Sequence, residues 1–156
     1  MTISSKVKNF LEQENIKYEV SEHSLAYTAA EVAGTQHVPG KQMVKSVIVK
    51  SDGQFIMCVL PAIHLIDFEK LRDVTGASNI ALAEEEEIGK LFPDYDLGAE
   101  PPFGQLYGLK VYADKILEED EQIVFNAGTH TDVVKIAFAD FKRIVNPTMA
   151  DIGTHI

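Results

Sequence analysis

The chain has 156 residues and a mass of 17.3 kDa, which fits one compact domain spanning 1–156. Hydrophobic residues make up 46% of it and charged residues 24%, a composition that excludes an intrinsically disordered chain. The formal net charge of −10 has the wrong sign for a protein that coats nucleic acid nonspecifically, so we expect no DNA partner.

Three features predict a cytoplasmic protein with no membrane partner. The longest nearly apolar stretch, 55–66, is broken by Pro61 and His64 and is shorter than the roughly 20 residues that cross a bilayer. The N-terminus turns polar at once, unlike a secretion signal. Cys58 is the only cysteine, which excludes an internal disulfide and Cys-rich metal sites.

In the first third of the chain, apolar spacing predicts an amphipathic helix over 3–14 and alternation predicts a strand over 17–22. A Thr-x-x-Glu capping box at 28–31 begins a short helix that should end near His37. The runs 43–50 and 54–60 read as antiparallel strands, because the Asp-Gly pair between them favours a tight hairpin. The second run is apolar on both faces, as expected of a central strand.

Further along, Asp67 as N-cap and Gly76 as C-cap bound a predicted helix. A strand over 80–83 and a Glu-rich helix ending near Phe92 follow. The stretch 93–108 holds three prolines and three glycines and predicts an organised functional loop that walls a site.

The last part of the chain predicts strands over 110–113, 122–125 and 132–138 and a closing helix over 139–145, ended by Asn146-Pro147. Strands mixed with short helices, and at least one hairpin, indicate an α+β fold around a mixed, mostly antiparallel sheet flanked by short helices. The acidic runs 84–87 and 118–121 are interpreted as solvated faces.

Lys45 is the first unusual residue, because a two-residue period places it on the same face as Met43, Val47 and Val49, a face that the pattern would bury. A lysine there either reaches solvent along its aliphatic stem at an edge position or meets an anion in a cleft.

Two further segments combine turn chemistry with groups useful around a polar substrate. Asn126 to Asp132 forms a small polar turn in which Gly128 permits close backbone approach and Thr129 and His130 offer hydrogen bonds. The second segment contains Gly98, Pro101, Pro102, Phe103 and Gly104, a rigid turn in which Phe103 would act as an aromatic lid. Each of the two segments can also be a plain turn without a functional role.

Other chemistries have weaker support in the sequence. It contains no G-x-G-x-x-G, Walker, G-x-S-x-G or H-E-x-x-H motif, and the five histidines are dispersed, so we expect no metal and no cofactor. Cys58 lies among apolar strand residues and is interpreted as a small buried hydrophobe rather than a nucleophile.

Taken together, these segments resemble the YbaK and prolyl-tRNA-synthetase-associated editing-domain family of aminoacyl-tRNA deacylases. The resemblance rests on the run from His23 to Ala33, on Val-Lys-Ser-Val-Ile-Val around Lys45, on Gly-x-x-Pro-Pro-Phe-Gly at 98–104 and on Asn-Ala-Gly-Thr-His at 126–130. It spans nearly the whole chain and implies the barrel-like sheet of that family.

The resemblance implies a hydrolase that cleaves the ester of a mischarged small amino acid on tRNA, acting in trans. Lys45 would hold the phosphate or ribose of the CCA end, and Gly128 and His130 would complete the catalytic set. The expected substrate-binding residues are Tyr27, Gly98, Pro101, Pro102, Phe103, Gly104, Asn126 and Thr129. A synthetase would be a further partner besides tRNA.

Two other functions remain open at this point. One is a noncatalytic module that binds an aminoacyl or nucleotide group, or another protein, without turnover. The other is a metal-dependent hydrolase that uses His130 and nearby acids.

Overall fold

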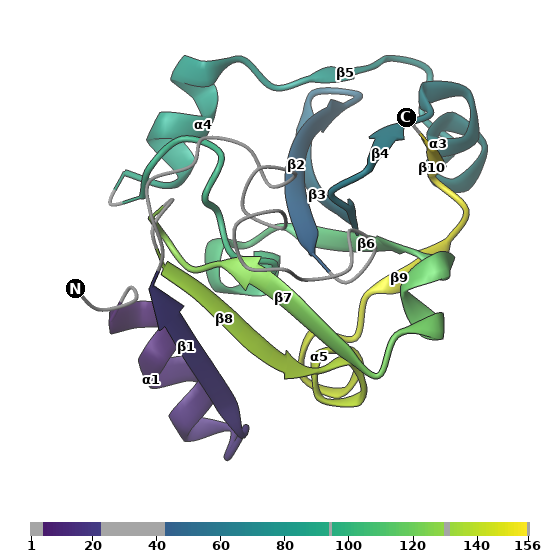
Figure 1. The fold of residues 1–156 in the computed structure, drawn as a ribbon. Helices are drawn as coiled ribbons and strands as arrows, with labels where there is room; N and C mark the ends of the chain where they lie inside the picture. The colour runs from purple at the N-terminus through teal and green to yellow at the C-terminus, as the bar shows by residue number, and fades with distance from the viewer. Residues whose placement is uncertain (1–4, 23–42, 94, 130–131, 156) are drawn as a thin grey trace.

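The computed structural model describes residues 5–22, 43–93, 95–129 and 132–155 (Figure 1). The helix predicted to begin at Thr28, the run that follows His23, and the side chains of Tyr27 and His130 lie outside these residues. No helix within the described ranges is long and apolar enough to cross a membrane.

The described residues form α-helices, two 3-10 helices and short to medium strands. The α-helices are α1 (Ser5–Gln13), α3 (Phe68–Thr75), α4 (Glu85–Leu91) and α5 (Phe138–Val145), and the 3-10 helices are η1 (Gly104–Tyr107) and η2 (Lys115–Glu119). The strands are β1 (Tyr18–Glu22), β2 (Val44–Ser51), β3 (Gln54–Pro61), β4 (His64–Ile66), β5 (Ile80–Leu82), β6 (Lys110–Asp114), β7 (Gln122–Asn126), β8 (Asp132–Ala137), β9 (Thr148–Ala150) and β10 (Gly153–His155).

A five-stranded sheet in the order β5-β2-β3-β6-β9 faces a three-stranded sheet in the order β1-β8-β7, and β10 pairs with β4. Among the ladders of the described residues, only β3-β6 and β6-β9 are parallel, so the predicted mixed, mostly antiparallel α+β architecture is confirmed. The β2-β3 hairpin turns through Asp52 (φ 47°) and Gly53 (φ 84°), the left-handed pair that tight hairpins need. As predicted, β3 lies inside its sheet and is buried along most of its length.

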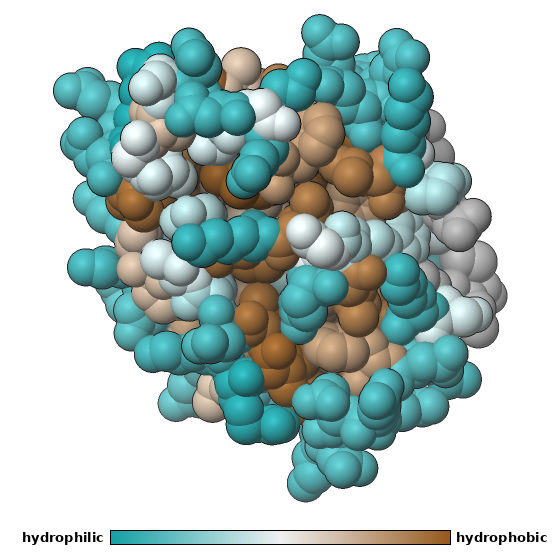
Figure 2. Space-filling model, turned by 180° about the vertical axis from the view of Figure 1, so that it is seen from behind, coloured by the Kyte–Doolittle hydropathy of each residue, from teal (hydrophilic) through white to brown (hydrophobic). Residues whose placement is uncertain are grey.

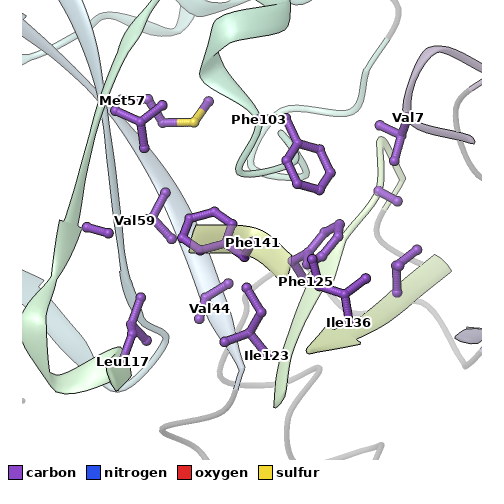
Figure 3. Packing of buried hydrophobic residues seen from close by; sticks show 14 of the residues in the cluster. Val7, Val44, Met57, Val59, Phe103, Leu117, Ile123, Phe125, Ile136 and Phe141 are labelled. Atoms are coloured by element: carbon purple, nitrogen blue, oxygen red, sulfur yellow. The ribbon is translucent and has the colours of Figure 1, made fainter. Parts of the chain in front are cut away.

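One hydrophobic core fills the space between the two sheets (Figure 3). Val44, Met57 and Val59 enter it from the larger sheet, and Phe125 and Ile136 enter it from the smaller one. A parallel bridge from Met43 to Val124 joins the sheets along one seam, so the arrangement is barrel-like, as predicted. Burying each such side chain contributes about 1.5–3 kcal/mol, which makes this core the main stabilising feature.

Short helices cover the sheets, and their ends follow the predicted capping signals. The carboxylate of Asp67 accepts hydrogen bonds from the backbone N–H groups of Glu69 and Lys70 at 3.1 Å each. Gly76 takes a left-handed φ of 73° at the other end of α3, and Asn146 does the same at 49° after α5. Leu71 of α3 packs on the outer face of the larger sheet, opposite the barrel core.

The structure differs from the sequence interpretation in the short strands and in one acidic run. The three-residue strands β4, β9 and β10 are not predicted, because three residues carry too little alternation to show a period. The acidic run at 118–121 is not solvated throughout: Asp120 is buried at the end of η2, where its backbone N–H donates to the carbonyl of Leu117. Elsewhere on the surface, Figure 2 shows patches of apolar residues across the middle of the rear face, with hydrophilic residues around them.

Candidate functional site

Lys45 lies near the beginning of β2, on the outer face of the barrel. Alternation along β2 sends Val44 and Ile48 into the barrel core and Lys45 to the opposite face, with Val47 and Val49, as predicted. The strand β5 pairs with β2 only at residues 49–51, so it does not cover the edge of β2 beside Lys45. The other neighbour on that edge is β7, through the bridge from Met43 to Val124.

The ammonium group of Lys45 is half-buried and lacks a described counter-charge. Burial lowers its pKa from the ordinary value, and no described carboxylate opposes that effect. A cation held partly out of water has a stronger field than one on the open surface. Lys45 is therefore suited to an anionic or strongly polar ligand group.

The end of β7 lies beside Lys45. Lys45 and Asn126 each lie two residues beyond the parallel bridge between Met43 and Val124, on β2 and β7 respectively. The side chain of Asn126 is 5% exposed, and its carbonyl oxygen has no hydrogen-bond partner among the described residues. A buried acceptor without a donor is costly, so this oxygen is available to a ligand or to water.

The predicted loop and the predicted turn meet through backbone hydrogen bonds. The N–H of Gly128 donates to the carbonyl of Ala99 at 2.9 Å, and the N–H of Asp96 donates to the carbonyl of Gly128 at 2.8 Å. Gly128 has φ 102° and Gly98 has φ 87°, conformations that L side chains rarely adopt. Two segments about 30 positions apart thus form one wall, which sequence spacing alone does not reveal.

The loop is tightened further by a buried acid. The N–H of Gly98 donates to Oε2 of Glu100 at 2.7 Å, and Glu100 is itself buried. The N–H of Ala99 donates to the carbonyl of Asp96 at 3.0 Å. These bonds fix the backbone conformation of residues 96–100, the segment that is hydrogen-bonded to Gly128.

Phe103 does not act as a lid, so that prediction is wrong. Its ring is fully buried in the barrel core, with its centroid 5.3 Å from the centroids of Phe10 and of Phe125 (Figure 3). An apolar ring gains more from this contact than from covering a polar site. Pro101, Pro102 and Gly104 are also buried. A Cβ on Gly104 would lie 2.7 Å from Cγ2 of Val111, so this glycine is required by packing.

Asp132 ends the predicted polar turn but is not among the predicted site residues. It is fully buried, and its Oδ2 accepts a hydrogen bond of 2.6 Å from the hydroxyl of Thr129. The backbone N–H of Asp132 donates back to that hydroxyl at 3.2 Å. The Thr-x-x-Asp spacing across a turn is the signal that could have indicated this pair.

The remaining chemical groups lie apart from this seam. Cys58 is fully buried and burial raises its pKa to about 12, which agrees with the interpretation of an inert hydrophobe. Nδ1 of His64 lies 3.8 Å from Oδ2 of Asp114 on β6. Within the described ranges no three His, Cys, Asp or Glu residues are grouped as metal ligands would be.

A separate depression of about 850 Å³ lies at the other end of the β2-β3 hairpin. Its lining includes the hairpin residues 51–56, Tyr107 and Tyr112. Lys45 is six residues from Ser51, or about 20 Å along a strand, so this depression is distinct from the seam.

Comparisons with known proteins give the seam its context. Residues 23–144 match the model of the aminoacyl-tRNA editing domain. Proline–tRNA ligases from Staphylococcus saprophyticus and from Staphylococcus aureus strain Newman are each 34% identical, over 76% and 83% of this chain. The chain spans only 22% and 24% of the length of these curated relatives.

Two solved structures share the fold across their whole lengths. The hypothetical protein APE2540 superposes with a TM-score of 0.87 at 19% identity, over 96% of this chain and 100% of its own. A candidate trans-editing enzyme for prolyl-tRNA synthetase superposes with a TM-score of 0.84 at 21% identity, over 98% of this chain and 99% of its own. With its family model, its relatives and its fold in agreement, this chain belongs to the aminoacyl-tRNA editing domain family.

Proposed function

We propose that this protein is an aminoacyl-tRNA deacylase that hydrolyses the ester of a mischarged small amino acid on tRNA, acting in trans in the cytoplasm. The observation that carries the proposal is the seam between β2 and β7, where the half-buried Lys45 follows the bridge by two residues on β2, and Asn126 and then the wall formed by Gly128 and the loop 96–100 follow it on β7. Membership of the editing-domain family supports the substrate class.

In this proposal Lys45 binds the phosphate or ribose of the CCA end and holds the ester in register. Its ammonium group has no described carboxylate to neutralise it, so its charge is available to a phosphate. A partly desolvated cation also stabilises the oxyanion that forms as water attacks the ester carbonyl.

The wall beside Lys45 surrounds the ester and the attacking water. Both backbone groups of Gly128 are engaged by the loop, so we assign Gly128 the task of holding the wall together. Gly98, Pro101, Pro102 and Gly104 would shape the wall through their backbone, and Asn126, Thr129, His130 and Tyr27 would line the pocket. Phe103 would support it from within the core.

Within the turn the hydroxyl of Thr129 is bonded to the buried carboxylate of Asp132. In this proposal the attacking water and the hydroxyl groups of the substrate carry the proton transfers. A second hydrolytic site is useful because one methylene is worth only about 1–3 kcal/mol in a single hydrophobic pocket. A synthetase that mischarges tRNA would be the partner upstream. The match to one segment of proline–tRNA ligases points to that enzyme.

The test is release of amino acid from alanyl-, cysteinyl-, seryl- and threonyl-tRNA by the unaltered protein, by Lys45→Ala and by Lys50→Ala. Lys50 lies on the same strand but pairs with Glu87 on the surface, which makes it a matched control for loss of one positive charge. We expect hydrolysis of one or two of these substrates, a loss of at least about 100-fold in Lys45→Ala and little change in Lys50→Ala.

Two results would contradict the proposal. No turnover of any substrate, with tight binding of aminoacyl-tRNA retained, would indicate a noncatalytic binding module. Activity that is lost on prolonged chelation and restored by a divalent metal would indicate a metal-dependent hydrolase.

A further inference from the structure

Asp132 has an environment unlike that of any other carboxylate in the described part of the chain. It is 0% exposed, whereas the other buried acids there, Glu100, Asp114 and Asp120, are each 4–6% exposed. Its Oδ1 has no hydrogen-bond partner among the described residues, and its Oδ2 receives one bond, from Thr129. Burying a carboxylate with so few donors costs free energy of folding. The contacts that Asp132 does make therefore indicate what this residue does.

Those contacts all act on one turn. Thr129 Oγ1 donates to Asp132 Oδ2 at 2.6 Å and accepts from the Asp132 N–H at 3.2 Å, so the two residues are joined twice. The carbonyl of Asp132 also accepts from the N–H of Ala127 at 3.3 Å. These bonds tie Ala127 and Thr129, on one side of the turn, to Asp132 at the start of β8.

The closed turn is what presents Gly128 to the loop. Gly128 lies between Ala127, which bonds to Asp132, and Thr129, which bonds to Asp132 twice. Its N–H and carbonyl then bond to Ala99 and Asp96. A continuous series of hydrogen bonds therefore runs from the buried carboxylate to the wall of the site.

We infer that Asp132 is a positioning residue for the editing reaction: acting through Thr129, it fixes the turn that holds Gly128. This inference rests on the proposed deacylase function. It assigns Asp132 no contact with the substrate, and its Oδ2 serves as the acceptor for the Thr129 hydroxyl. Misplacement of catalytic groups by about 1 Å can cost about 100-fold in rate.

The experiment compares Asp132→Asn, which keeps an acceptor oxygen for Thr129, with Asp132→Ala and Thr129→Val, which do not. We expect Asp132→Ala and Thr129→Val each to lower kcat about 10- to 100-fold with KM within about threefold, and the double variant to be no worse than either one. Asp132→Asn should recover kcat to within about threefold of the unaltered protein.

Asp114→Asn is the matched control, because Asp114 is also buried and its carboxylate accepts from the backbone N–H of Ile116, at the end of β6 rather than in the turn. It should lower the unfolding midpoint and leave kcat unchanged. Amide hydrogen exchange provides a readout independent of catalysis. Exchange at Gly128 should be at least about tenfold faster in Asp132→Ala and Thr129→Val, and unchanged in Asp114→Asn.

Three outcomes would overturn the inference. Faster exchange at Gly128 with unchanged kcat would show that the turn need not be fixed. Unchanged exchange would show that Asp132 does not fix it. Equal loss of kcat in Asp132→Asn and Asp132→Ala would show that the charge itself takes part in the chemistry.

If the unaltered protein hydrolyses no aminoacyl-tRNA, the proposed function fails on its own. The role of Asp132 is then decided by affinity for a 3′-amide analogue of aminoacyl-adenosine. Weaker binding by Asp132→Ala, with recovery in Asp132→Asn, supports the positioning role, and equal affinities overturn it.

Discussion

Lys45 and Gly128 are single residues whose contributions to the candidate site were visible in the sequence for different reasons. Lys45 interrupts an apolar alternation, and the structure places it on the expected face with its pKa lowered by burial. Gly128 lies in a small polar turn, and its φ of 102° is a conformation that a side chain would strain. Asp132 is not predicted as a site residue, because the Thr-x-x-Asp spacing indicates a turn but does not show that the acid is buried.

The conformation of Gly128 leads to a prediction about stability. Gly128→Ala should lower the free energy of unfolding by about 1–2 kcal/mol, because an L residue is disfavoured at this φ. Gly89→Ala is the control, because Gly89 lies within α4 and nothing lies within 4 Å of an added Cβ. This change should raise the free energy of unfolding by up to about 1 kcal/mol. Urea denaturation measures both. Equal effects of the two changes would contradict the strain at Gly128.

At the level of elements, what could be predicted depended on how local the signal was. The β2-β3 hairpin and the ends of α3 follow from adjacent residues such as Asp52-Gly53 and Asp67, and they were predicted correctly. The pairing of β4 with β10 joins residues 64–66 to 153–155, and short strands that distant in sequence share no local pattern. The docking of the loop 96–100 on Gly128 was unpredictable for the same reason.

The loop between α4 and β6 is anchored by Phe103, and this gives a test of whether that residue serves packing or substrate recognition. Phe103→Leu should lower the free energy of unfolding by about 1–2 kcal/mol and leave amino-acid selectivity unchanged, because the ring is fully buried in the barrel core. Urea denaturation and kcat/KM for two aminoacyl-tRNAs measure the two effects.

Phe141→Leu is the control for this change. Phe141 is equally buried but comes from α5, outside the loop. Phe141→Leu should lower the free energy of unfolding by a similar amount and leave the amino-acid selectivity unchanged. A change of selectivity in Phe103→Leu alone would mean that Phe103 faces the substrate.

For the whole molecule, charge limits how tRNA can be held. The net charge of −10 opposes extended contact with the phosphate backbone, and we expect binding through the acceptor end, with two or three phosphate contacts around Lys45. The affinity for aminoacyl-tRNA should then fall by about 10- to 40-fold between 50 and 200 mM salt, compared with the 10³- to 10⁵-fold typical of 6–10 contacts. Titration with salt measures the slope, and a steep one would contradict the limited-contact picture.

The pairing of β1 with β8 has a consequence for synthesis on the ribosome. Tyr18 lies opposite Ile136, so β1 gains its partner strand only after more than a hundred further residues have been added. At a synthesis rate of about 5–20 residues per second, roughly 6–24 s pass between the synthesis of β1 and that of its partner strand β8. During that interval the α1-β1 segment has no sheet to join. The three-stranded sheet, and with it the turn at Gly128, is therefore completed only after β8 has been synthesised.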